Sequence, residues 1–95
     1  MLNLNHKNLD VWQLAIKLVS TIYQITSKYP KEEVFGLTSQ TRRAVVSISA
    51  NLAEGSSRKS LAERKRFYEI SRSSLVEVDN HIEVAKELGY LSDET

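Results

Sequence analysis

Breaks are rare in this chain, and their positions limit what it can fold into. The only residues of the two helix-breaking types among its 95 are Pro30, Gly36, Gly55 and Gly89. Proline removes a backbone hydrogen bond and glycine leaves the backbone unrestricted, so both mark the ends of helices. Three of the segments that they bound, residues 1–29, 37–54 and 56–88, are long enough for helices of several turns. The sequence therefore predicts an all-α fold, with a single domain over residues 1–95.

The first segment carries apolar residues at helical spacing. Steps of three and four separate Leu9, Trp12, Ile16, Val19, Tyr23 and Thr26. These steps predict a helix over about residues 8–28, which ends before Pro30. A second apolar stripe beside the first comprises Val11, Leu14, Leu18 and Ile25. Together the stripes exceed what one core-facing side needs, which predicts contact with a further helix, from this chain or another copy. For contact with another copy, the candidate oligomer interface is Leu14, Leu18 and Ile25.

Two further helices follow. Residues 38–54 predict the second, with Gly55 as the residue that follows its end. Its core face consists of Leu37, Ala44, Val45, Ile48 and Leu52. The tetrapeptide SLAE, from Ser60 to Glu63, has the pattern of a capping box, which satisfies free N–H groups at a helix start. It predicts a third helix that runs to Gly89.

The residues after Gly89 have the pattern of a helix start. Ser92 is of a type that caps helix N-termini, and Asp93 and Glu94 favour the positive end of the helix dipole. The predicted architecture is an antiparallel up-down four-helix bundle, of which the sequence holds three helices and the start of a fourth. Most of the fourth helix is expected to be missing from the sequence.

The second predicted helix also carries a polar stripe, formed by Gln40, Arg43, Ser47, Asn51 and Glu54. At 100° per residue these side chains fall within roughly 80° of the helix surface. One interpretation is a structural network, in which the groups bond to one another and to neighbouring backbone. The other is a seam that receives a ligand or RNA. The sequence leaves both interpretations open.

Charge is distributed unevenly, although the net charge is only +1. Residues 42–72 contain eight Lys and Arg against three Glu, whereas residues 73–95 contain one Lys against six acids. The third predicted helix therefore begins basic and ends acidic, opposite to the order that its dipole favours. Three explanations fit: a surface that binds RNA or DNA, a head-to-tail contact between copies that closes into a ring, and ordinary surface solvation.

The candidate nucleic-acid-binding residues are Arg42, Arg43, Arg58, Lys59, Arg64, Lys65, Arg66 and Arg72. Clustered cations neutralise phosphates, which is the requirement for sequence-independent binding. Tyr68 is close enough in the sequence to offer a ring on which a base can stack.

Residue patterns typical of enzymes are missing. The chain has no cysteine and its glycines are isolated, which excludes thiolate sites and phosphate-binding glycine loops. His81 follows Glu77 by one helical turn, and a packed or interface histidine is the favoured interpretation of this pair. We expect a non-catalytic protein without metal or cofactor. The apolar runs are too short for a membrane span and the start lacks a secretory signal, so a cytoplasmic location is expected.

Three segments carry a family resemblance: VWQLA, FGLTSQTRRAVVSISANLAEG and LGYL. Over residues 9–91 the sequence resembles the four-helix-bundle proteins encoded in bacterial 23S rRNA intervening sequences, also called the S23 ribosomal-protein family. That family is related to the accessory variability protein of diversity-generating retroelements.

The resemblance implies an assembly and partners. It implies a homopentameric barrel. In the retroelement relatives the basic surface is associated with nucleic acid and with the reverse transcriptase, so by analogy the resemblance implies RNA or DNA and a reverse transcriptase as partners. The matching motif positions in this sequence are Gln40, Arg42, Arg43, Ser47, Asn51, Glu54 and Gly55. Ser49 departs from the family pattern, which usually has proline there.

Overall fold

The computed structural model describes residues 4–93, and every regular element in that range is helical. In chain order the elements are two short 3-10 helices and three α-helices: η1 (Asn5–Asn8), α1 (Asp10–Thr26), η2 (Lys31–Glu33), α2 (Leu37–Ser57) and α3 (Leu61–Glu87). The all-α prediction is confirmed. Up to residue 93 the chain forms no helix after α3, and Glu94 lies outside the described residues, so the four-helix form is not observed.

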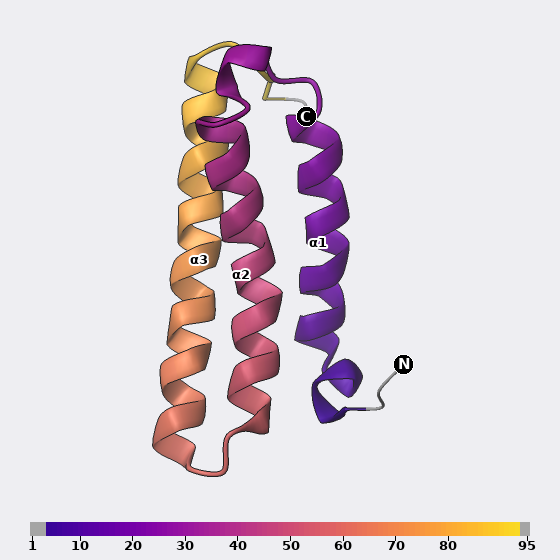
Figure 1. Cartoon of the computed structure of the whole chain (residues 1–95), viewed down its shortest axis with the longest axis vertical. Coiled ribbons are helices and arrows are strands. Elements are labelled where there is room, and N and C mark those ends of the chain that lie inside the picture. Colours follow the sequence, from indigo (N-terminus) through magenta and orange to yellow (C-terminus); the bar gives the residue numbers. More distant parts are fainter. Residues whose placement is uncertain (1–3, 94–95) are drawn as a thin grey trace.

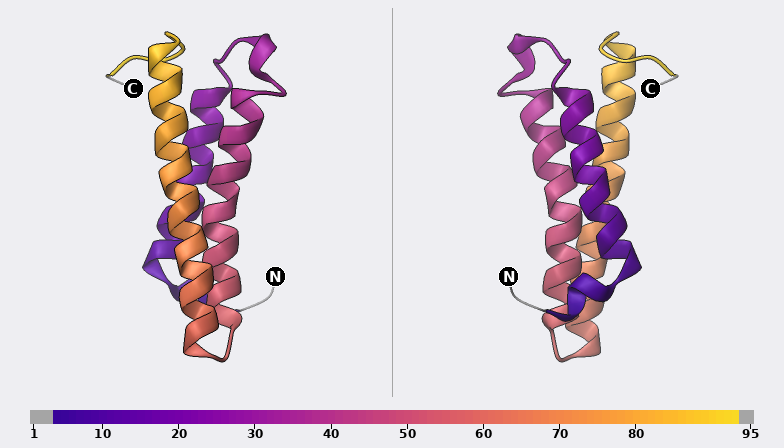
Figure 2. Two further views of the ribbon diagram at one scale, coloured as in Figure 1. Left: turned by 90° about the vertical axis from the view of Figure 1, so that its left-hand side faces the viewer. Right: turned by 90° about the vertical axis from the view of Figure 1, so that its right-hand side faces the viewer.

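The three α-helices run up, down and up, with extents of 44 × 27 × 25 Å (Figure 1). α2 packs against both α1 and α3, whereas no Cα atom of α1 comes within 8 Å of a Cα atom of α3. The α2–α3 turn and η1 lie at one end of the molecule, which we call the hairpin end (Figure 2). The η2 segment lies at the other end, together with the C-terminus of α3; we call this the η2 end.

All three α-helices contribute to one core. Its buried members are Ala15, Ile22, Ala44, Val45, Ile48, Leu52 and Val78. The core face predicted for the second helix is confirmed, because all five of its residues are buried. A second cluster at the η2 end joins Tyr29, Leu37 and Ala85. Each large apolar side chain buried in this way contributes about 1.5–3 kcal/mol.

The helix ends follow the predictions except at Gly55. α1 ends shortly before Pro30, and α3 ends shortly before Gly89, whose φ of 79° lies in the left-handed region that glycine adopts readily. Ser60 Oγ accepts a hydrogen bond from the Glu63 N–H at 3.1 Å, as the capping pattern predicts. The prediction that Gly55 follows the second helix is wrong, because α2 continues through it to Ser57.

α1 turns the region between its two apolar stripes toward the core. Ala15 and Ile22 are buried there. Of the candidate oligomer interface, Leu14 is 65% exposed, whereas Leu18 and Ile25 are half-buried against the two core clusters. The outer part of this stripe therefore remains accessible along α1. Among the described residues, no helix combines the length and apolar character of a membrane span.

Candidate nucleic-acid interface

The polar stripe of α2 lies along α3, and part of it is hydrogen bonded. Asn51 Nδ2 donates to the Ser47 carbonyl and to Ser47 Oγ, at 2.9 Å each. Ser74 Oγ of α3 donates to the same Ser47 Oγ at 2.9 Å. Ser71 Oγ donates to the Ile48 carbonyl at 2.8 Å. These bonds satisfy the polar groups at the α2–α3 contact, and the small serine side chains let the two helices pack closely.

The remaining stripe residues are engaged differently. Glu54 forms an ion pair with Arg58 at 3.0 Å, one helical turn later. Gln40 and Arg43 are exposed, and their side chains have no bonding partner among the described residues. Together with Glu77 they line a shallow hollow of about 340 Å³. The structure thus joins the middle of the stripe to α3 and leaves its first turn open to solvent.

Arg42 connects α2 to α1. Its Nε donates to Thr26 Oγ1 at 2.8 Å, and its Nη2 donates to the Tyr23 carbonyl at 3.3 Å. Its guanidinium also lies 4.4 Å from the centroid of the Tyr23 ring. Roughly 24 Å of helix separates Arg42 from Arg58. The eight predicted cations therefore fall into two groups, with Arg42 and Arg43 apart from the other six.

Six cations gather at the hairpin end and along the first half of α3. We call them the hairpin cations: Arg58, Lys59, Arg64, Lys65, Arg66 and Arg72. The hairpin itself depends on two of them, since Arg64 Nε donates to the Arg58 carbonyl at 2.6 Å. Lys59 and Lys65 are exposed and form no ion pair with a described residue. Their charges are therefore available to a ligand.

Arg58 is the most enclosed of the hairpin cations. Besides its ion pair with Glu54, its Nε lies 3.7 Å from a Glu63 carboxylate oxygen, which is too long for a hydrogen bond. Its guanidinium lies 4.8 Å from the centroid of the Phe67 ring. These contacts give Arg58 a structural role, and they reduce the share of its charge that a ligand meets.

A mainly apolar hollow of about 510 Å³ lies on the first half of α3. It is lined by Leu61, Arg64, Lys65, Tyr68, Glu69 and Arg72. Leu61 is 79% exposed and Tyr68 is 37% exposed. Steps of four residues separate Arg64, Tyr68 and Arg72, which therefore share one face of the helix. An aliphatic and an aromatic side chain are thus accessible among three cations and one carboxylate.

A comparison with known protein families identifies the family to which this chain belongs. The family model for the 23S rRNA-intervening sequence protein matches residues 7–95. The chain belongs to this family. The match covers all three α-helices and both ends of the molecule, and it confirms the family resemblance found in the sequence. No curated protein matches the chain.

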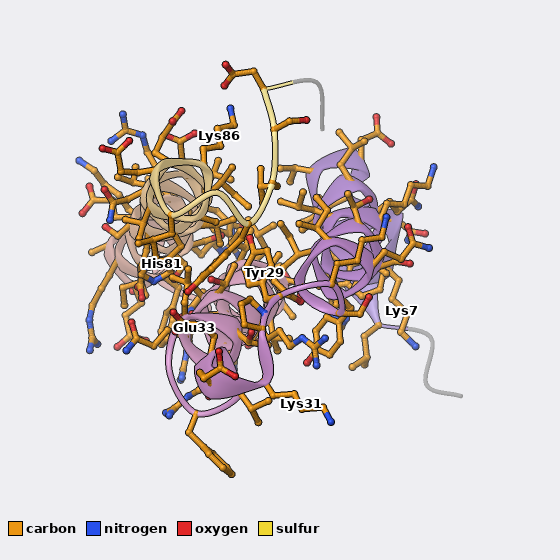
Figure 3. All side chains as sticks on the ribbon, turned by 90° about the horizontal axis from the view of Figure 1, so that it is seen from above. Lys7, Tyr29, Lys31, Glu33, His81 and Lys86 are labelled. Carbon is orange, nitrogen blue, oxygen red and sulfur yellow. The ribbon has the colours of Figure 1, made fainter. Side chains whose placement is uncertain are left out.

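In this 23S rRNA-intervening sequence protein, the η2 end contains an anchor that the sequence did not reveal. Glu33 accepts from the Leu37 N–H at 3.0 Å and from the Tyr90 hydroxyl at 2.7 Å. Tyr29 is buried between the helices near Glu33 (Figure 3), and its ring centroid lies 5.4 Å from that of Tyr90. No local pattern predicts this contact, because Glu33 and Tyr90 lie on different elements far apart in the sequence.

The three side chains that form this anchor, Glu33, Tyr90 and Tyr29, all have shifted pKa values. The Leu37 N–H, followed by the Tyr90 hydroxyl, lowers the pKa of Glu33 below its ordinary value. The same bond to Glu33 raises the pKa of Tyr90. Burial raises the pKa of Tyr29. Tyr90 therefore donates to a carboxylate that stays ionised over the neutral range.

His81 contacts Glu77, the residue one turn earlier, as its spacing predicts. The His81 Nε2 and the Glu77 carboxylate are 3.1 Å apart. His81 lies where α3 faces α2 (Figure 3), and its side chain is only 12% exposed. Among residues 4–93 no group of three or more His, Cys, Asp or Glu side chains is placed to hold a metal ion.

Proposed function

We propose that this family member binds RNA through the hairpin cations, without catalysing a reaction. One observation carries the proposal: six Lys and Arg residues gather at the hairpin end and along the first half of α3, while the acids of the second half of α3 lie toward the other end. Helix stability does not favour this order, because cations at a helix N-terminus oppose the dipole. Binding to phosphate gives the arrangement a function.

Phosphate binding requires only clustered cations, which makes it a sequence-independent interaction. The family description refers to 23S rRNA, so RNA is the nucleic acid to test first. If about four cations per chain neutralise phosphates of a single strand, the slope of log K against log salt is about −3.

Reversal of two free charges tests the proposal. Lys59→Glu with Lys65→Glu changes only side chains that bond to no described residue, so the fold is expected to survive. We expect the double variant to bind a fluorescent RNA at least about tenfold more weakly at low salt, with a shallower salt slope. Fluorescence anisotropy over a salt series measures both quantities, and circular dichroism checks the helicity.

The matched control reverses two charges at the other end. Lys28→Glu with Lys31→Glu produces the same net charge at exposed positions near the η2 end. If both double variants weaken binding equally, net charge alone governs it and the hairpin surface is not the site. Salt-insensitive binding by the original chain would also contradict the proposal.

Association between copies is a second candidate function, and the accessible apolar side of α1 favours it. Val11 and Leu14 are 54% and 65% exposed on neighbouring turns. Separated charge at the two ends would then orient one copy against the next in a ring, such as the pentamer that the family resemblance implies. Dissociation of the assembly by salt would support this use of the charges.

A further inference from the structure

We propose that the hollow around Tyr68 makes this surface selective for unpaired nucleic-acid strands, with a base stacked on the Tyr68 ring. This inference rests on the proposed function and adds the form of nucleic acid that the site takes. It assigns the aromatic ring to the base, and it assigns Arg64 and Arg72, one turn to either side, to the flanking phosphates.

The Tyr68 ring is held in place by α2. A Cβ atom built at Gly55 would lie 2.7 Å from Tyr68 Cε1 and 2.9 Å from Cδ1, so one edge of the ring lies directly against the glycine backbone. The residue nevertheless remains 37% exposed. A ring fixed by one edge loses little conformational freedom when a base stacks on it, which favours binding.

The surroundings of the ring match a nucleotide. Leu61 extends the apolar surface beside Tyr68 and is 79% exposed. Arg64, Lys65 and Arg72 supply three positive charges around the hollow, against the single carboxylate of Glu69. An acidic partner would contact only the cations, and a purely apolar partner would contact only the ring and Leu61. A nucleotide engages both, through its base and its phosphates.

The same geometry distinguishes a single strand from a duplex. In a duplex the base faces are stacked inside, so the duplex offers phosphates, 2′-hydroxyls and base edges but no free base face to the Tyr68 ring. The hairpin cations then contribute and Tyr68 does not. An unpaired strand presents base faces as well, and aromatic side chains hold them through stacking with little sequence preference.

The test compares one strand in two forms. The probes are a labelled oligouridine of roughly 12 nucleotides and its duplex with oligoadenosine, titrated with the full chain and followed by anisotropy. We expect the original chain to prefer the single strand. Tyr68→Leu should weaken single-strand binding by about 5- to 100-fold and leave duplex binding within about twofold, while Tyr68→Phe should retain both.

A second variant covers the case in which Tyr68→Leu disturbs the α2–α3 contact. Leu61→Asp places a carboxylate beside the ring at an exposed first-turn position, where an acid is compatible with the helix. It should weaken single-strand binding more than duplex binding. Circular dichroism melting shows whether either variant remains folded.

The outcomes separate the two proposals. One outcome is that Lys59→Glu with Lys65→Glu weakens binding to both the single strand and the duplex, while Tyr68→Leu and Leu61→Asp change the two affinities equally or not at all. This outcome overturns the base-stacking role and leaves the RNA-binding proposal standing. The base-stacking role is also overturned if Tyr68→Phe loses as much as Tyr68→Leu. If the original chain binds neither form at low salt, both proposals are overturned.

Discussion

At the scale of single residues, Glu33 links two separate segments at the η2 end. Its two carboxylate oxygens serve two segments: one accepts from the first N–H of α2, and the other accepts from Tyr90, which follows α3. Gly89 directs the chain there, because its positive φ allows the Tyr90 N–H to donate to the Ala85 carbonyl at 2.9 Å. One ionised side chain thus caps a helix and fixes the chain after α3.

This role predicts a pH dependence. A carboxylate with a lowered pKa stabilises the fold fully above its unfolded pKa, and this contribution is lost as the pH falls through the folded value. Glu33→Gln cannot ionise. We therefore expect it to be less stable than the original chain at neutral pH, and the difference should shrink as the pH falls.

Thermal unfolding from about pH 7 to about pH 3 measures this change. Glu32→Gln is the matched control, because Glu32 is exposed beside Glu33 and makes no side-chain bond to a described residue. A stability difference for Glu33→Gln that is the same at every pH would contradict the assignment.

At the scale of elements, α2 is the helix on which the other two pack, and Gly55 shows what that position requires. Glycine inside a helix ordinarily costs about 1 kcal/mol relative to alanine. Here the missing side chain makes room for α3, because Phe67 Cβ lies 3.1 Å from the point that a Cβ at Gly55 would take, and Tyr68 lies closer still. Close packing between the helices therefore explains a residue that weakens α2 locally.

Gly55→Ala should destabilise the protein, although replacing glycine by alanine inside a helix usually stabilises it. Forcing a methyl group against a ring and a helix costs about 1–3 kcal/mol, which exceeds the gain in helix propensity. We expect a net loss of about 1 kcal/mol in the free energy of unfolding, measured by urea denaturation. Gly55→Ala combined with Tyr68→Ala should lose less than the sum of the two single variants.

Ser73→Ala serves as the control for this series, since Ser73 is exposed on α3 and bonds to no described residue. It should change the free energy of unfolding by less than about 0.5 kcal/mol. If Gly55→Ala stabilises the protein instead, the contact with Tyr68 does not limit the α2–α3 distance.

At the scale of the whole molecule, three helices leave one side of α1 uncovered. No Cα atom of α1 lies within 8 Å of one of α3, and Leu14 and Val11 of α1 remain exposed. The hairpin cations and the acids of the second half of α3 are separated along the long axis. A second copy placed on α1 would cover the apolar side chains. The separated charges would favour one orientation of that copy over the other.

Leu14→Glu tests whether copies associate through α1. Since Leu14 is 65% exposed, the substitution should preserve helicity while reducing the molar mass of the assembly, as measured by light scattering. Phe35→Glu is the control, because Phe35 is 96% exposed in the loop before α2 and does not belong to α1. A single-copy mass for the original chain would contradict association, and equal effects of the two variants would place the contact elsewhere.

Local patterns in the sequence were sufficient to predict most of the fold. Apolar residues predicted the first helix and the core face of α2, and the capping pattern at Ser60 predicted the start of α3, because periodicity and capping depend only on neighbouring residues. Gly55 misled the prediction for the same reason. A glycine at a helix end and a glycine beneath a packed helix look alike when only their neighbours in the sequence are considered.

The sequence predicted which residues belong to the candidate site but not which of them lie together in space. The sequence by itself determined that the chain is helical, that it carries clustered cations and that its charge is asymmetric, since these properties depend on residue order alone. Only the tertiary structure decided that Arg42 donates hydrogen bonds to α1 and that Tyr90 donates one to Glu33. It also decided that the Tyr68 ring packs against Gly55, among the hairpin cations. Each of these contacts joins separate helices, so it exists only once the helices have packed.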